Sequence, residues 1–354
     1  MPQVTSKERI HTALDHKEPD LVPLDLWITP EIEAALMRET GAEDPFELRV
    51  RLGHDCLISH VGLVASFYMN EEPQYVDPWG ITFRRVSFGG GSYTEMVGHP
   101  LAGDDAKLAS FKPPDPEEPF HYEKISRLIG RYGRTHSIAG GILGAVFEGP
   151  WYLRGMDQFL ADMLLNKDYA HALVDLVAGW HLKAGLKLIR MGCDLILAGD
   201  DLGAQDRLLI SPELFREFVK PWYGKLFGAF KRADPSVKIA THICGYVEPI
   251  IDDLIETGVD VLNPVQPLAM DPARLKKRYG ARLSFWGAVD DQRVLPLGSP
   301  EEVAVEVRLR LAQLAPGGGY ILCSSHNVQP GTPIENIHAY YRAAENYRSY
   351  PLKV

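Results

Sequence analysis

Apolar, β-prone runs recur along the chain, separated by stretches whose apolar residues have helical spacing. Several of the later runs are continuously apolar rather than alternating, which is typical of parallel strands buried on both faces. Runs of this kind predict eight strands, at residues 21–27, 55–59, 136–143, 194–198, 237–241, 259–263, 282–286 and 320–324.

The stretches between these runs carry signals of helix ends. Ser211 and Ser299 each stand before a proline and a glutamate, a pattern that gives an N-cap and a proline at the first helical position. Residues 157–190 predict two helices, and 248–257 predict another that ends at Gly258. Because strand and helix alternate through eight strands, the chain is predicted to be an α/β protein with a (β/α)8 TIM-barrel fold.

Residues 72–100 break this alternation. They are rich in aromatic and β-branched residues around Gly89-Gly90-Gly91, which predicts an inserted antiparallel β-hairpin. No linker, repeat or low-complexity tract divides the 354 residues, so we expect a single barrel domain over residues 1–354.

Composition and charge argue against several classes of function. The net charge is −10 and no cluster of lysine and arginine stands out, so nucleic acid is not an expected partner. No apolar run approaches the roughly 20 residues that span a bilayer, and the polar N-terminus carries no secretory signal, so we expect a cytoplasmic protein. Cys56 and Cys193 lie in apolar runs and are expected to be buried and inert.

Soft metal ligands stand at the ends of two predicted strands. His242 and Cys244 are two residues apart in Thr-His-Ile-Cys-Gly, so on an extended chain their side chains point to the same face. Cys323 stands at the matching end of a later strand. Because the C-terminal ends of barrel strands meet at one face, one imidazole and two thiolates are expected to converge there. This ligand set is typical of a catalytic zinc site with an open fourth position.

Further polar residues follow the predicted strands on the same face. Glu148 is a candidate fourth ligand or proton carrier, although a capping role explains it equally well. Asp200 and Asp201 are candidates for orienting the His242 imidazole, and at least one of them is expected only to cap the following turn. His326 is a candidate for hydrogen bonding to a substrate.

Substrate contacts are predicted from one amide and several aromatic side chains. Asn263 follows the sixth strand and is a candidate hydrogen-bonding residue. Trp27, Phe147 and Trp286 stand near strand ends, where they could line an aromatic pocket or belong to the core.

Three segments of the chain resemble the uroporphyrinogen decarboxylase superfamily. They are Pro-Asp-Leu-Val-Pro-Leu-Asp at 19–25, Cys-Asp-Leu-Ile-Leu-Ala-Gly-Asp-Asp at 193–201, and a stretch at 325–336 that closes with Gln-Pro-Gly-Thr-Pro-Ile-Glu-Asn. The resemblance implies a (β/α)8 barrel. Decarboxylases of this superfamily carry an arginine-rich stretch after the first strand, whereas residues 26–33 contain two acids and no arginine, and residues 59–63 lack the catalytic aspartate expected after the second strand.

The resemblance is better to the branch of cobalamin-dependent methyltransferases. Their zinc ligands follow a His-x-Cys and Cys pattern, which His242, Cys244 and Cys323 match. The resemblance implies transfer of a methyl group between a small substrate and the corrinoid of a partner protein, because the chain has no Asp-x-His-x-x-Gly corrinoid motif of its own. It also suggests a homodimer.

The substrate is less well defined by the sequence than the branch. O-demethylation of a methoxylated aromatic is favoured by the candidate aromatic residues and by the lack of an obvious cationic site for a sulfonate. Methyl transfer to a thiol such as coenzyme M and a decarboxylase-type carboxy-lyase remain alternatives. A third is a barrel that only binds a corrinoid protein or a tetrapyrrole.

Overall fold

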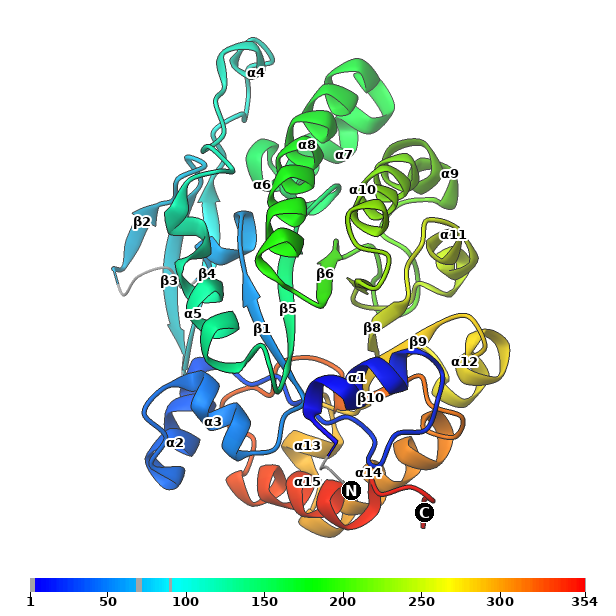
Figure 1. The fold of residues 1–354 in the computed structure, drawn as a ribbon. Coiled ribbons are helices and arrows are strands. Elements are labelled where there is room, and N and C mark those ends of the chain that lie inside the picture. The colour runs from blue at the N-terminus through cyan, green and yellow to red at the C-terminus, as the bar shows by residue number, and fades with distance from the viewer. Residues whose placement is uncertain (1–3, 68–71, 89–90, 354) are drawn as a thin grey trace.

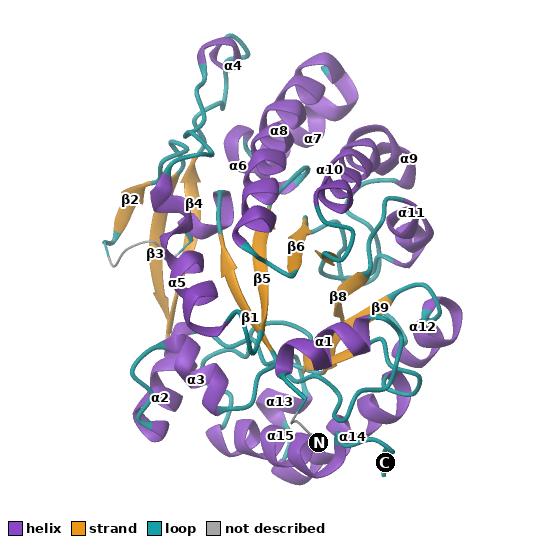
Figure 2. Ribbon diagram, in the orientation of Figure 1, coloured by secondary structure: helices purple, strands orange, loops and turns teal. Residues whose placement is uncertain are grey.

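Seven parallel strands form one curved sheet that is surrounded by helices, as Figures 1 and 2 show for this computed structural model. The structure describes residues 4–67, 72–88 and 91–353. Each strand pairs with the next one along the chain, as in a β/α barrel. The strands of this sheet are β1 (Cys56–His60), β5 (Ser137–Leu143), β6 (Leu195–Gly199), β7 (Lys238–His242), β8 (Val261–Val265), β9 (Ser284–Val289) and β10 (Tyr320–Ser324).

The eighth position of the barrel is filled by an irregular segment. The prediction of a regular strand at 21–27 was wrong, although the segment lies where that strand was expected, between β10 and β1. Leu24 forms an isolated parallel bridge with Leu322 of β10, and its carbonyl accepts a hydrogen bond from the Asp55 N–H at 2.8 Å. Pro23 has no N–H to donate, which helps to explain why a regular ladder does not form here.

The other predicted strands are confirmed with boundaries shifted by at most three residues. Both serine caps are also confirmed, since Ser211 accepts from the Leu214 N–H and Ser299 forms a capping box with Glu302. The helices are α1 (Ser6–Leu14), α2 (Pro30–Thr40), α3 (Pro45–Arg51), α4 (Lys107–Ser110), α5 (Glu123–Tyr132), α6 (Glu148–Arg154), α7 (Met156–Leu165), α8 (Lys167–Met191), α9 (Pro212–Leu214), α10 (Lys220–Ala233), α11 (Ile251–Glu256), α12 (Pro272–Tyr279), α13 (Val294–Leu297), α14 (Pro300–Leu314) and α15 (Ile334–Tyr347). Within the described residues, none of these helices is both long and apolar enough to cross a bilayer.

The insertion after β1 is a small antiparallel sheet beside the barrel (Figure 2). It consists of β2 (Gln74–Val76), β3 (Thr82–Phe88) and β4 (Gly91–Gly98), and β3 with β4 forms the predicted hairpin. Two residues of the predicted glycine turn, Gly89 and Gly90, lie outside the described residues.

The inside of the barrel is filled by its own cluster of buried side chains. Ile10 and Leu14 of α1 belong to this cluster together with inward-facing residues from the strands. Trp286 and Cys323 are fully buried members of the same cluster. The inside of the barrel is therefore a packed core.

A buried carboxylate joins the two ends of the chain to the closing segment. Asp55, which is only 1% exposed, stands directly before β1. Its side chain pairs with Arg9 of α1 at 2.6 Å and with Arg348 after α15 at 2.9 Å. It also accepts a hydrogen bond from the Leu24 N–H at 2.9 Å. Asp55 therefore links the first helix, the last helix and the eighth barrel position.

We expect Asp55→Ala to lower the free energy of unfolding by about 3–5 kcal/mol, because it leaves two arginines without their buried partner. Urea unfolding at pH 7 measures the change. Glu95→Ala, which breaks an exposed ion pair with Arg84, is the control and should cost about 1 kcal/mol or less. Equal losses for the two variants would contradict the proposed role of Asp55.

Candidate metal centre at the mouth of the barrel

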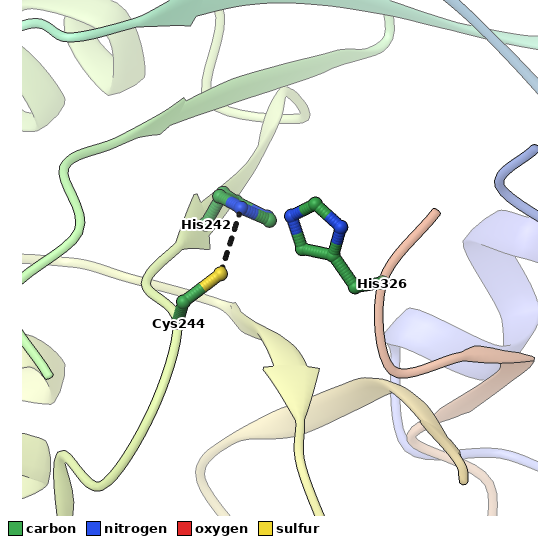
Figure 3. A group of neighbouring side chains, drawn as sticks. All are labelled: His242, Cys244 and His326. Carbon is green, nitrogen blue, oxygen red and sulfur yellow. Dashed lines mark hydrogen bonds between the residues drawn. The ribbon is translucent and has the colours of Figure 1, made fainter. Parts of the chain in front are cut away.

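Two histidines and one cysteine bring soft ligand atoms together at the C-terminal ends of β7 and β10. His242 is the last residue of β7, Cys244 follows it by two residues, and His326 lies two residues beyond β10. Their ligand atoms all lie within 4.8 Å of one another, and no other such group of three His, Cys, Asp or Glu occurs in the described ranges. Figure 3 shows His242 at the end of its strand, Cys244 on the segment that continues from it, and His326 approaching the same region from a separate loop.

The orientation of His242 suits a metal ligand. Its Nδ1 lies 2.6 Å from Asn263 Oδ1, an oxygen that can only accept, so Nδ1 carries the proton and Nε2 presents a lone pair. Nε2 lies 3.4 Å from Cys244 Sγ. A tetrahedral zinc ion with one nitrogen and one sulfur ligand would separate those two atoms by about 3.5 Å, so the geometry fits. Trp27 stacks on the imidazole, with 5.2 Å between ring centroids, and holds the plane of the ring.

The protonation preferences around this group also favour a bound cation. Burial and the nearby charge of His242 lower the pKa of His326 to about 4, so its imidazole is neutral at pH 7, as a ligand must be. Burial, together with the negative charges of Asp201 and Glu148, raises the pKa of the Cys244 thiol. A divalent ion would offset this local negative potential and allow the thiolate to form.

Cys323, the third zinc ligand predicted from the sequence, is not a member of this group. Its side chain is fully buried inside the barrel, where Sγ lies 3.8 Å from Ser324 Oγ. The loop residue His326, which the sequence analysis treated as a substrate contact, takes the third place instead. A signal was present in the spacing, because Cys244 and His326 each lie two residues past the end of a strand.

Asp200 has a structural position rather than the orienting position considered for it. It is completely buried and accepts hydrogen bonds from three successive backbone N–H groups at 146–148. Its other oxygen accepts from the Tyr223 hydroxyl at 2.8 Å. The carboxylate thus fixes the turn that leads into α6, whereas the alternative considered for this aspartate was a cap on the turn that follows it in the chain.

Asp201 and Asn263 surround the candidate ligands. Asp201 Oδ1 accepts a hydrogen bond from the Cys244 N–H at 2.9 Å and lies 3.8 Å from His242 Nε2. Asn263, considered above as a substrate contact, instead contacts His242 and is 1% exposed. The amide therefore holds the imidazole, a role that was considered for the aspartates.

Glu148 begins α6 and lines the cavity beside the candidate metal ligands. The Tyr152 hydroxyl donates a hydrogen bond to its Oε1 at 2.8 Å. Burial, followed by the negative charges of Asp201 and Asp200, raises the pKa of Glu148 well above its usual value. Its carboxyl group therefore keeps a proton more readily than an exposed glutamate does, which suits a proton donor.

A cavity of about 490 Å³ opens at this end of the barrel. Of the aromatic residues considered as substrate contacts, Trp27 lines it. Phe147 and Trp286 do not, because both are buried, Phe147 against Phe159 and Trp286 edge-on against Trp27. Aromatic residues that the sequence did not single out, together with two cations, complete the wall: Phe46, Phe67, Tyr152, Arg49 and Lys124.

His60 is a further cavity residue that the sequence analysis missed. It ends β1, and its Nδ1 is buried without a hydrogen-bond partner among the described residues. Burial, with the charges of His242 and Lys124, lowers its pKa to about 4, so the ring is neutral at pH 7. The only signal for this role in the sequence is the position of His60 just after the end of a predicted strand.

We expect Asp200→Ala to lower the free energy of unfolding by about 3–5 kcal/mol, since it leaves several buried donors without an acceptor. The control is Tyr223→Phe, which removes one of these donors and should cost about 1 kcal/mol. Urea unfolding followed by circular dichroism measures both. A change below about 1 kcal/mol in Asp200→Ala would show that the turn is fixed by other contacts.

Comparison with known proteins supports the fold and identifies relatives. The sequence profile of the family described as Uroporphyrinogen decarboxylase (URO-D) matches residues 84–347. A solved structure described as a methyltransferase from Methanosarcina mazei superposes with a TM-score of 0.76 at 23% sequence identity, covering 97% of this chain and 99% of that one. At this identity the similarity establishes the fold alone.

Relatives with curated names fall into two groups. A methylcobamide:CoM methyltransferase of Methanosarcina barkeri is 26% identical over 225 residues, which cover 64% of this chain and 62% of the relative. A methylated-thiol–coenzyme M methyltransferase of Methanosarcina mazei is 26% identical over 62% of this chain and 56% of its own length. A uroporphyrinogen decarboxylase of Prochlorococcus marinus is 24% identical over 70% of each chain. The matches thus span less than two thirds of either methyltransferase.

Proposed function

The chain belongs to the uroporphyrinogen decarboxylase family, and from that premise we propose that it is a metal-dependent methyltransferase, which moves a methyl group between a small substrate and the corrinoid of a partner protein. The observation that carries the proposal is the cluster of His242, Cys244 and His326 at the barrel mouth. A decarboxylation of the family's eponymous type needs no such ligand set. Two of the relatives described above are named as methyltransferases, which supports the same assignment.

The proposed metal is Zn²⁺, because two imidazoles and one thiolate are its preferred kind of ligand set and leave a fourth position open. Bound there, zinc would supply Lewis-acid stabilisation of negative charge on a sulfur or oxygen atom of the substrate. The residues around it hold the site: Asn263 and Trp27 fix the His242 ring, and Asp201 fixes the Cys244 backbone.

For the substrate, we favour a methoxylated aromatic compound and hence O-demethylation. The aromatic wall formed by Trp27, Phe46 and Phe67 suits a planar ring. When the methyl group departs, the aryl oxygen keeps the electrons of the broken bond and needs a proton. Glu148 lines the cavity, and burial with the charges of Asp201 and Asp200 raises its pKa, so it is the residue placed to donate that proton.

Methyl transfer to a thiol is the second candidate, and one observation favours it. No cationic site for a thiol that carries a sulfonate was found in the sequence, but the cavity is lined by Arg49 and Lys124. One of the two grounds for preferring a methoxylated aromatic substrate, the lack of a cationic site, is therefore removed. The named activities of the methyltransferase relatives point in the same direction as these cations.

The metal assignment predicts that protein purified without chelator carries about one zinc per chain, as measured by elemental analysis. Cys244→Ala and His326→Ala should lose this metal because each removes a ligand. Cys323→Ala, the matched control, should keep it, because its sulfur lies outside the cluster. Loss of zinc from Cys323→Ala with retention in His326→Ala would reinstate the ligand set predicted from the sequence.

The activity is tested with free cobalamin in place of the corrinoid protein. Incubation with cob(I)alamin and methoxyarenes should form methylcobalamin, detected by its absorbance, and Cys244→Ala should reduce the rate by at least about 100-fold. Transfer from methylcobalamin to thiols, without reaction of any methoxyarene, would instead establish the second candidate. Decarboxylation of uroporphyrinogen by protein stripped of metal would contradict both.

A further inference from the structure

Beside the cavity at the barrel mouth lies a second, smaller space between α3 and α5. This groove has a volume of about 370 Å³. It shares three lining residues with the cavity, namely Pro45, Phe46 and Lys124. The two spaces therefore adjoin at these residues, and Lys124 borders both of them.

Two cations of α5 face this groove without a partner. Lys124 and Arg127 are three residues apart on the helix, so they lie on the same face. Within the described part of the chain, neither forms an ion pair or a hydrogen bond, and Lys124 Nζ only lies 5.5 Å from the centroid of the Phe46 ring. The neighbouring arginines differ, because Arg131 pairs with Asp44, and Arg49 with a glutamate of α2. Two uncompensated cations on one face stand out in a chain of net charge −10.

Lys124 lines both spaces, and the carboxyl groups of Glu148 and Asp201 line the cavity together with His60. The other lining carboxyl groups already have partners: Asp25 contacts His54, Glu33 pairs with Arg49, and Asp44 pairs with Arg131. The groove itself adds the apolar side chains of Phe46 and Leu128 beside the cations.

We propose that Lys124 and Arg127 bind an anionic group of the substrate, a carboxylate or sulfonate, while its methyl-bearing or methyl-accepting atom lies beside the candidate metal ligands. The inference rests on the proposed function, since it assigns the class of substrate for the same site. The substrate is preferred over a partner protein as the occupant because the groove shares its walls with the reaction cavity. Apolar walls beside the cations suit a short carbon skeleton or a single ring.

The test compares ligands that differ only in the charge of one end. Calorimetric titration of the zinc-loaded protein would use 4-methoxybenzoate against 4-methoxybenzyl alcohol, and 3-mercaptopropionate against 3-mercaptopropanol. We expect the acid of at least one pair to bind about tenfold more tightly than its alcohol, and the preference to shrink as salt is added. The double variant Lys124→Gln/Arg127→Gln should bind acid and alcohol equally.

Arg134→Gln is the matched control, because Arg134 is exposed just beyond α5 and does not line the groove. It should keep the preference of the unmodified protein. Both substituted side chains in the double variant are exposed, so its thermal unfolding should be unchanged, and a loss of preference then reports on binding. Equal affinity for acid and alcohol in the unmodified protein, a preference that survives in the double variant, or no binding of any of the four ligands overturns the proposal.

This readout is separate from the test of the proposed function. The titration measures which end of a ligand the protein recognises and requires no methyl transfer. A protein that carries zinc and transfers methyl groups without preferring acids would refute only the anion site. A protein that prefers acids but transfers no methyl group would refute only the proposed activity. The groove would instead be a protein-docking surface if each acid bound with the same affinity in all variants while the double variant no longer bound an acidic partner protein. In that case the proposal fails.

Discussion

The buried charge of Asp55 is the interaction on which closure of the barrel depends. A barrel removes its free edges only when every strand position is filled, and here one position is filled by a segment that Pro23 keeps from forming a regular ladder. Asp55 holds that segment through the Leu24 N–H and is itself held by arginines from the first helix and from beyond the last one. The same segment continues to Trp27, whose ring stacks on His242. Closure of the fold and orientation of a candidate ligand therefore depend on the same few residues of chain.

The carboxylates at the mouth mostly hold backbone rather than perform chemistry. Asp200 satisfies a turn, and Asp201 satisfies the N–H of Cys244. Their charges nevertheless act on their neighbours. Burial raises the pKa of Glu148, and the charges of Asp201 and Asp200 raise it further. Burial also raises the pKa of the Cys244 thiol, and the charge of Asp201 adds to this effect. One arrangement thus favours the protonated forms of a carboxyl group and a thiol, and a bound cation would favour the thiolate. Both are what the proposed chemistry requires of these positions.

Hydrophobic periodicity was sufficient to predict seven of the eight barrel positions, because buried parallel strands have a distinctive continuous apolar pattern. It was not sufficient to show which of the side chains near the end of a strand belongs to the candidate metal centre. Cys323 lies within β10 and points into the packed interior, whereas His326 reaches the mouth because its loop has left the strand. Lys124 was also missed, since it comes from a helix distant in sequence from the strand ends, and its proximity to the cavity arises only from tertiary packing.

Family membership leaves the reaction open, because relatives of this chain carry the names of both decarboxylases and methyltransferases on similar barrels. Four carboxyl groups line the cavity, those of Asp25, Glu33, Glu148 and Asp201, together with two cations, Arg49 and Lys124. Arg49 is already paired with Glu33. A substrate that carries carboxylates all around its rim would meet few unpaired cations here, and like charges brought together would oppose its binding. The thiol and imidazoles at the mouth suit a cation that activates a reactive atom, which agrees with the proposed function.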